Sequence, residues 1–325
     1  MTSRNSSAAA EPPDVWPYVV YAVEGLVIGG GNLLIVICIW HFEALRQSKT
    51  YLVLLGLSLA DAFNMLAYLT AGVYRTIMVV VLNKDLDSLV PIQYCLWFPH
   101  VWIWSWAEHI SGLMLVAVSV DRLFSVWSPL QYMGWQKGYA RCLLLLTYST
   151  AFMTAVVGMG QVLPDRDVLL VRALCSNIDM MKYVGPTPNF GLYFAFGAPF
   201  FGCLSVMLYV FVWIGYQYQK SQVVPFQEGE QADEDERQKS VTRIVGVSCV
   251  CTVFLYVIPL VCGYVVLYIG LATPIAIAFF CLSNLNPLAN VFLYSLRLEQ
   301  IQMGLKALIR CHQMPMDIKL WKSNG

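Results

Sequence analysis

The chain has 325 residues, of which 58% are hydrophobic and only 12% are charged. Soluble globular domains carry about 25% charged residues, so this composition excludes a water-soluble fold of this length and indicates a membrane protein. The formal net charge at pH 7 is zero, which excludes the charge excess of nucleic-acid-binding proteins, and we expect no nucleic-acid partner.

The chain begins with a polar tail, residues 1–15, that is rich in proline, alanine and serine. This tail lacks the basic region and short apolar core of a cleaved signal peptide. We therefore expect the first apolar run to act as an uncleaved signal anchor.

Seven apolar runs follow the tail, and each reaches the ~20 residues that a helix needs to cross the hydrocarbon core of a bilayer. Their residues do not alternate with period two, which disfavours a β-barrel, and lipid requires each backbone polar group to be satisfied within its own segment. We predict an all-α membrane protein, a seven-transmembrane helix bundle, with spans at 16–40, 50–74, 95–120, 142–163, 190–216, 244–269 and 271–296.

The distribution of basic residues orients this bundle. If the N-terminus lies outside the cell, the inner loops and the C-terminal tail hold 14 of the 20 Lys and Arg residues. The positive-inside rule therefore predicts a multi-pass membrane protein with its N-terminus on the outer side. Asn5 begins the sequence Asn-Ser-Ser on the extracellular side, so we expect it to be an N-glycosylation site.

The region after the last span is amphipathic. Residues 297–310 predict a short eighth helix lying on the membrane, which ends the 16–296 bundle domain and precedes a cytosolic tail, 311–325. Cys311 follows this helix and is a candidate for palmitoylation, with a free thiol as the alternative. The residues expected to face lipid are Leu298, Ile301, Leu305, Leu308 and Ile309.

Two of the ten cysteines face the oxidising side of the membrane. Cys95 lies at the outer end of the third span, and Cys175 lies in the long second outer loop. Since disulfides form on this side, the pair predicts one bridge that pins the loop over the mouth of the bundle. Two unrelated thiols are the alternative.

A charge pair stands at the inner end of the third span. It begins the pattern D-R-x-x-x-V-x-x-P-L-x-Y, formed by Asp121, Arg122, Val126, Pro129, Leu130 and Tyr132. Further matching positions occur in the other spans, namely Gly31-Asn32, Leu57-Ser58-Leu59-Ala60-Asp61, Pro199, Pro259 and Asn286-Pro287. Over nearly its whole length the chain resembles the rhodopsin-like (class A) G protein-coupled receptors.

The resemblance implies a plasma-membrane receptor with an extracellular N-terminus that binds an extracellular ligand and activates a heterotrimeric G protein. The residues it assigns to coupling and activation are the six of the charge-pair pattern together with Asn286, Pro287 and Tyr294. The chain also departs from the family pattern. Val257 replaces the usual tryptophan of span six, and Asn290 replaces the usual tyrosine of span seven, with Tyr294 one turn later.

One face of the third span connects the two expected sites. Trp104, Glu108, Ser111, Leu115, Val118 and Arg122 follow one another at steps of three or four residues. Trp104 and Arg122 are five helical turns, or about 27 Å, apart, so a single helix can join an outer ligand pocket to the inner surface.

The ligand pocket implied by the resemblance comprises Trp104, Glu108, Val257, Leu260 and Phe280. Glu108 either meets a cationic ligand group or pairs with a polar neighbour. The family's monoamine receptors carry an aspartate at the position of Trp104, and opsins carry the retinal lysine at Phe280. These differences disfavour both ligands and leave a peptide or an apolar small molecule. A neuropeptide receptor and a chemosensory receptor are both consistent with the sequence.

Other polar residues lie within the spans. Burying a polar side chain in lipid costs free energy, so each of them is expected to have a structural or functional role. The resemblance implies an allosteric Na⁺ site at Asp61, Ser111, Ser283 and Asn286, with a dry polar network as the alternative. Glu24 in span one is expected to form a structural hydrogen bond.

The rival classes of membrane protein find less support. A transporter or channel usually shows internal repeats, and none is visible. The four histidines, His41, His100, His109 and His312, form no metal-spaced cluster, so we expect no enzyme and no cofactor beyond the possible Na⁺.

Overall fold

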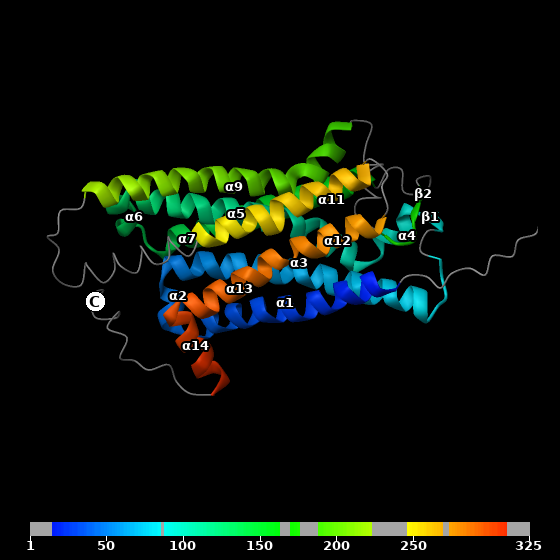
Figure 1. Cartoon of the computed structure of the whole chain (residues 1–325), viewed down its shortest axis with the longest axis horizontal. Coiled ribbons are helices and arrows are strands. Elements are labelled where there is room, and N and C mark those ends of the chain that lie inside the picture. The colour runs from blue at the N-terminus through cyan, green and yellow to red at the C-terminus, as the bar shows by residue number, and fades with distance from the viewer. Residues whose placement is uncertain are drawn as a thin grey trace, which may run out of the picture.

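A computed structural model describes residues 15–85, 88–162, 170–175, 188–222, 246–268 and 273–310. These residues are almost entirely helical, and the long helices run side by side along the long axis of the molecule (Figure 1). Within them, seven helices are long and apolar enough to cross a membrane. The predicted seven-helix bundle is confirmed, and the protein is a multi-pass membrane protein.

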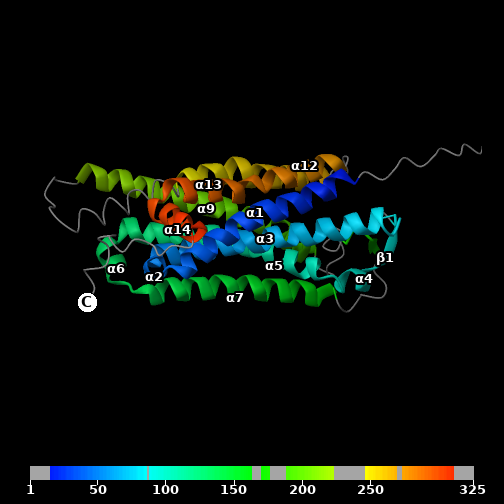
Figure 2. The same ribbon diagram turned by 90° about the horizontal axis from the view of Figure 1, so that it is seen from below.

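The first five spans are formed by α1 (Trp16–His41), α3 (Lys49–Val80), α5 (Pro99–Trp127), α7 (Lys137–Val162) and α9 (Pro188–Gln222). Span six contains the π-helical turn η2 (Val253–Val257) and α11 (Ile258–Tyr268), and span seven contains α12 (Thr273–Ser283) and α13 (Leu285–Arg297). Figure 2 shows α7 on the side of the bundle opposite α12 and α13. The remaining elements are α2 (Glu43–Gln47), α4 (Ile92–Leu96), α6 (Pro129–Gly134), α14 (Glu299–Ile309), β1 (Leu89–Pro91) and β2 (Leu170–Arg172).

In four of the spans, predicted boundaries differ from the helix ends by several residues. The fourth span, predicted to begin at residue 142, begins at Lys137, and the fifth, predicted to end at residue 216, continues to Gln222. The second span, predicted to end at residue 74, continues as helix to Val80. The third span, predicted to begin at residue 95, begins at Pro99 instead. Proline has no N–H and favours the first helical turn, while it holds the residue before it, Phe98, in an extended conformation (φ −91°, ψ 126°).

Proline also explains irregularities in spans six and seven. In η2 the Ile258 N–H bonds to the Val253 carbonyl, five residues back, directly before Pro259. A π-helical turn of this kind accommodates the missing donor and the bulk of the proline ring. Span seven is interrupted at Asn284, three residues before Pro287, and the Asn284 side chain donates to Glu24 on α1 at 2.9 Å. Glu24 therefore makes the structural hydrogen bond expected of it.

Helices α1 and α3 pack closely, because glycines allow their backbones to approach each other. A Cβ atom added at Gly72 would lie 2.6 Å from the Ala22 nitrogen and the Tyr18 carbonyl oxygen, and one at Gly25 would lie 2.5 Å from the Leu69 nitrogen. Membrane helices use small residues to pack closely, because in lipid the hydrophobic effect does not drive their association.

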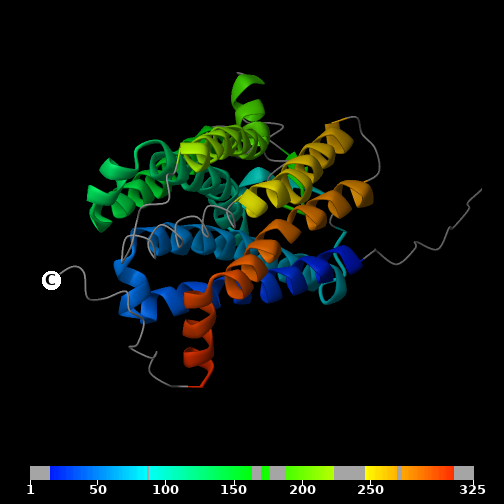
Figure 3. The same cartoon turned by 60° about the vertical axis from the view of Figure 1, so that its left-hand side comes forward.

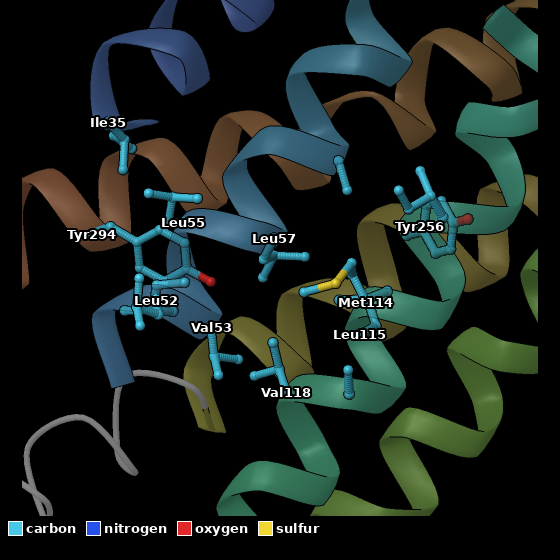
Figure 4. Packing of buried hydrophobic residues seen from close by; sticks show 14 of the residues in the cluster. Ile35, Leu52, Val53, Leu55, Leu57, Met114, Leu115, Val118, Tyr256 and Tyr294 are labelled. Atoms are coloured by element: carbon cyan, nitrogen blue, oxygen red, sulfur yellow. The ribbon is translucent and has the colours of Figure 1, made fainter. Parts of the chain in front are cut away.

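The main apolar core joins several spans around α5. Figure 4 shows buried side chains from α1, α3, α5, span six and α13 converging, among them Ile35, Leu52, Leu55, Leu57, Met114, Leu115, Val118, Tyr256 and Tyr294. Large apolar side chains also cover the outside of the bundle, where Leu26 is 65%, Leu145 69% and Phe254 63% exposed. In a membrane protein these exposed side chains contact lipid.

The bundle has two distinct ends. We call the end that carries the disulfide between Cys95 and Cys175 the disulfide end, and the opposite end of α5 the Arg122 end. The predicted disulfide is confirmed. Beside it β1 and β2 pair antiparallel, with Val90 opposite Val171, so that the short segment 170–175 is bound to the bundle by covalent and hydrogen bonds.

The eighth helix exists, but its predicted orientation is partly wrong. α14 begins at Glu299 and runs across the Arg122 end at a steep angle to the bundle (Figure 3). Ile301 is completely buried against the protein, and Leu298, directly before the helix, is nearly so. Gly304 lies directly under the Cys38 sulfur of α1. Of the residues expected to face lipid, Leu305 and Leu308 are partly buried against the core, and Ile309 is exposed.

The glycine contacts generate a prediction. Replacing Gly72 with alanine should destabilise the protein by about 1–3 kcal/mol, because the added methyl group must push α1 and α3 apart. The measurement is the thermal unfolding midpoint of the purified protein in detergent.

Gly30 on α1 provides the matched control. Nothing lies within 4 Å of a Cβ atom added there, so Gly30→Ala should be neutral or slightly stabilising. Equal midpoints for the two variants would contradict the close approach of α1 and α3.

Candidate functional site

The Arg122 end holds a buried charge network. Arg122 is 1% exposed, and its Nε donates to Asp121 Oδ2 at 3.0 Å. Its Nη2 also forms an ion pair with Asp121 and donates to the Tyr132 hydroxyl at 3.1 Å and to the Thr50 hydroxyl at 3.3 Å. Three elements, α3, α5 and α6, thus hold one guanidinium in place.

Tyr132 closes this network into a ring. Its hydroxyl accepts from Arg122 and donates to Asp121 Oδ1 at 3.0 Å. Burial raises the pKa of Tyr132 to about 12, so the hydroxyl keeps its proton and remains a donor at neutral pH. The chain brings it there because α6 starts at Pro129, directly after the C-terminal end of α5.

Lys49 holds α6 against α3. Its ammonium group donates to the backbone carbonyls of Tyr132 and Trp135, the latter at 3.2 Å, and lies 3.7 Å from the centre of the Tyr132 ring. Thr50, the next residue, contacts Arg122 directly. The sequence analysis missed both residues, because nothing in their spacing distinguishes them from ordinary polar residues at the start of a span.

The predicted coupling residues divide into two groups. Pro129 and Leu130 are exposed, Leu130 by 80%, and they form an accessible surface on α6. Val126 and Tyr132 are buried, as is Tyr294. Val126 contacts α9 where a Cβ at Gly215 would lie 2.9 Å from its methyl group. In this conformation only part of the predicted set could meet a partner.

A chain of hydrogen bonds crosses the middle of the bundle. Asp61 Oδ2 accepts from Asn290 Nδ2 at 3.2 Å, and Asn290 Oδ1 accepts from the Ser248 hydroxyl at 2.6 Å. Nearby, the Thr252 hydroxyl donates to Asn286 Oδ1 at 3.1 Å. Spans two, six and seven are therefore linked through polar side chains.

The residues expected to bind Na⁺ are all buried, but the structure gives them individual partners. Asp61 bonds to Asn290, which the sequence marked only as a departure from the family pattern, and the Ser283 hydroxyl donates to the Phe280 carbonyl at 2.7 Å. Among the residues that the structure describes, the Ser111 hydroxyl has no hydrogen-bond partner, and neither does that of Ser58. A carboxylate with spare hydroxyl oxygens is a donor set that suits a hard cation.

The residues of the expected ligand pocket lie in two apolar clusters toward the disulfide end. Trp104 belongs with Tyr21 and Tyr68 on the α1 and α3 side, where its ring lies 4.9 Å from that of Tyr68. Val257, Leu260 and Phe280 belong to the main core, and the Phe280 ring lies 5.5 Å from that of Tyr264.

Glu108 connects these clusters. It lies within electrostatic reach of the tyrosines of both, Tyr68, Tyr256 and Tyr264. Its Oε2 is buried and has no hydrogen-bond partner in the described part of the chain. The structure thus leaves an unsatisfied carboxylate oxygen between the rings that line both sides of α5.

Arg75 is a further buried residue that the sequence analysis missed. It follows directly after the predicted end of the second span at residue 74, yet it is 3% exposed and buried within the last turns of α3. The signal was present in the spacing, because Asp61, Tyr68 and Arg75 are seven residues apart and share one helix face.

The comparison with known families decides the class of this bundle. A family model described as the serpentine type 7TM GPCR chemoreceptor Srsx matches residues 26–300. The chain belongs to this family. No match is found among curated proteins.

Membership of Srsx confirms the resemblance to G protein-coupled receptors that rested on the Asp121-Arg122 pattern. Srsx is a family of receptors and not a class of enzymes. Of the two receptor types that the sequence left open, the chemosensory receptor fits the family.

The Arg122 network generates a prediction. Tyr132→Phe should lower the free energy of unfolding by about 1–3 kcal/mol, because both Arg122 and Asp121 lose a buried hydrogen-bond partner. Thermal unfolding of the purified receptor measures the change.

Tyr139 is the matched control, since its ring packs near that of Tyr132 and its buried hydroxyl has no partner among the described residues. Tyr139→Phe should therefore leave stability unchanged or raise it. An equal loss of unfolding free energy in both variants would show that the Tyr132 hydroxyl stabilises the protein no more than the Tyr139 hydroxyl does.

Proposed function

We propose that this protein is a plasma-membrane chemosensory receptor that binds an extracellular small molecule and activates a heterotrimeric G protein. The observation that supports this most is the continuity of α5. The helix carries Trp104 and the unsatisfied Glu108 toward the disulfide end and Arg122 at the other, without a break from Pro99 to Trp127.

Activation on this proposal is a shift between two conformations. We take the described structure as the closed conformation, because the Arg122 guanidinium bonds to Asp121, Tyr132 and Thr50, and Val126 and Tyr132 are buried. Opening the Arg122 end would free these residues for a G protein next to the exposed Leu130. A ligand drives that opening only by binding the open form more tightly, typically by 1–3 kcal/mol for coupled sites.

The orientation and modifications belong to the same proposal. A disulfide forms on the oxidising side of a membrane, which supports an extracellular disulfide end and an extracellular N-terminus. Glycosylation of Asn5 and palmitoylation of Cys311 concern residues outside the described ranges and remain predictions. The description of the family as chemoreceptors favours a small molecule over a neuropeptide as ligand.

The first test concerns Arg122. In cells that express a promiscuous G protein, a metabolite library should yield an agonist of the wild-type receptor, and Arg122→Ala should abolish that signal while ligand binding persists. The exposed Arg141 at the same end serves as control, and Arg141→Ala should signal normally. Full signalling by Arg122→Ala, at equal surface expression, would refute the coupling role.

The second test concerns Na⁺, which we propose binds at Asp61 with Ser111, Ser283 and Asn286. The thermal unfolding midpoint should be higher in NaCl than in KCl at equal ionic strength, and Asp61→Asn should remove the difference. Glu24→Gln removes another membrane acid that has its own partner and should keep the Na⁺ response. A wild-type receptor that does not distinguish the two salts would favour the dry polar network.

A further inference from the structure

Arg75 occupies an unusual environment at the disulfide end of the bundle. Its Nε donates to the Leu174 carbonyl at 3.2 Å, directly before the disulfide-bonded Cys175. Its guanidinium carbon lies 5.3 Å from the centre of the Trp104 ring and 5.9 Å from the rings of Tyr18 and Tyr21. The side chain is therefore held from two sides by aromatic faces and a tethered loop.

No acid neutralises this buried cation within the described ranges. Across those residues the only salt bridge is that of Arg122 with Asp121, and Arg75 Nη2 has no hydrogen-bond partner. Burying a charge without a counter-ion costs several kcal/mol, and a structural arginine would normally have its donors satisfied. An anion that the described structure does not contain would remove this cost.

A second unsatisfied group stands beside Arg75. His100 is 1% exposed, its Nε2 has no hydrogen-bond partner among the described residues, and its ring lies within electrostatic reach of Arg75. The ring is fixed by stacking, 4.9 Å from Tyr74 and 5.8 Å from Phe98. The His100 ring therefore lies in the neighbourhood of Arg75, against Tyr74, the residue that precedes Arg75 in the chain.

The backbone adds to the same positive region. His100 is in the first turn of α5, which has 29 residues and begins at Pro99. Pro99 has no N–H group, and that of Val101 donates to the Phe98 carbonyl at 3.2 Å. The first turn therefore contributes mainly the positive end of the helix dipole, which favours anions. No acidic residue stands in the first turn of α5.

We propose that Arg75, His100 and the first turn of α5 form a carboxylate-binding subsite that selects small organic acids as ligands of this receptor. The inference rests on the proposed receptor function and names its ligand class. The planar guanidinium matches a carboxylate in shape and charge. The apolar part of the acid would lie on the rings of Tyr21, Tyr68 and Trp104, which pack together below Arg75.

Thermal unfolding of the full-length receptor in detergent tests the subsite without a known agonist. The probes are sodium acetate and sodium propionate, each compared with its uncharged amide at equal ionic strength. A ligand that binds the folded state raises the unfolding midpoint in a saturable way, so the acids should stabilise the wild type more than the amides do. Arg75→Gln should abolish this difference, and Arg75→Lys, which keeps the charge but loses the planar fork, should reduce it.

Lys84 is the matched control, because it is an exposed cation at the same end of the bundle. Lys84→Gln should respond to the acids as the wild type does. An equal response in Lys84→Gln and Arg75→Gln, or no response to either acid in the wild type, would overturn the subsite.

The chain itself could supply the anion from its N-terminal tail, through Glu11 or Asp14. The double variant Glu11→Gln/Asp14→Asn decides this. If acetate stabilises the receptor only after both tail acids are removed, the tail is the natural partner of Arg75, and the ligand proposal is wrong. An unchanged acetate response supports an external acid.

Signalling separates this inference from the proposed function. Acidic agonists should need at least about tenfold higher concentrations on Arg75→Gln, the size expected for losing a charge-assisted hydrogen bond. If every agonist is neutral and acts equally on that variant, the subsite is wrong while the receptor function stands. If no compound gives an Arg122-dependent signal, the receptor function fails, and the acetate experiment still decides the subsite.

Discussion

The structure depends on neutralising a guanidinium where water is absent. Arg122 is buried at the end of α5, and a lone charge there would cost several kcal/mol. Asp121, Tyr132 and Thr50 supply the charge and the hydrogen bonds, and Lys49 holds Tyr132 in position. This requirement ties α3 and α6 to the end of α5 through the contacts of one side chain.

The polar groups of the bundle differ in how well they are satisfied along its length. Near the Arg122 end Asp121, Arg122 and Tyr132 satisfy one another, although the Tyr139 hydroxyl has no partner among the described residues. Toward the disulfide end Arg75 Nη2, His100 Nε2 and Glu108 Oε2 all lack one in the described structure. Ser58 and Ser111, nearer the middle of the bundle, lack one too within the described ranges. Native proteins rarely leave such atoms unpaired, so unpaired groups from the middle of the bundle to the disulfide end are what a ligand-binding region would show before its ligand arrives. In the proposed function, the continuous helix α5 would transmit ligand binding from the disulfide end to the Arg122 network.

Much of the fold follows from local properties of the chain. Hydropathy locates seven spans because each helix must satisfy its own backbone in lipid, whatever its neighbours do. Only two cysteines face the oxidising side of the membrane, which is enough to pair Cys95 with Cys175. The residue pattern from Asp121 to Tyr132 is enough to indicate a G protein-coupled receptor. The errors lie where proline or packing overrides hydropathy. Pro99 moves the start of the third span, and the contact of α14 with Cys38 and Phe42 turns Ile301 inward.

The sequence by itself determined the class of protein, its spans, its disulfide and the face of α5 that runs from Trp104 to Arg122. These are properties of a single segment or of a linear pattern. Only the tertiary structure decided that Asp61 bonds to Asn290, that Tyr132 completes the Arg122 network, and that Arg75 lies beside His100 instead of in a loop. Such partners come from different helices, and they depend on the rotation and register of each helix against its neighbours. Hydropathy is nearly insensitive to both, because an apolar helix remains apolar however it is turned.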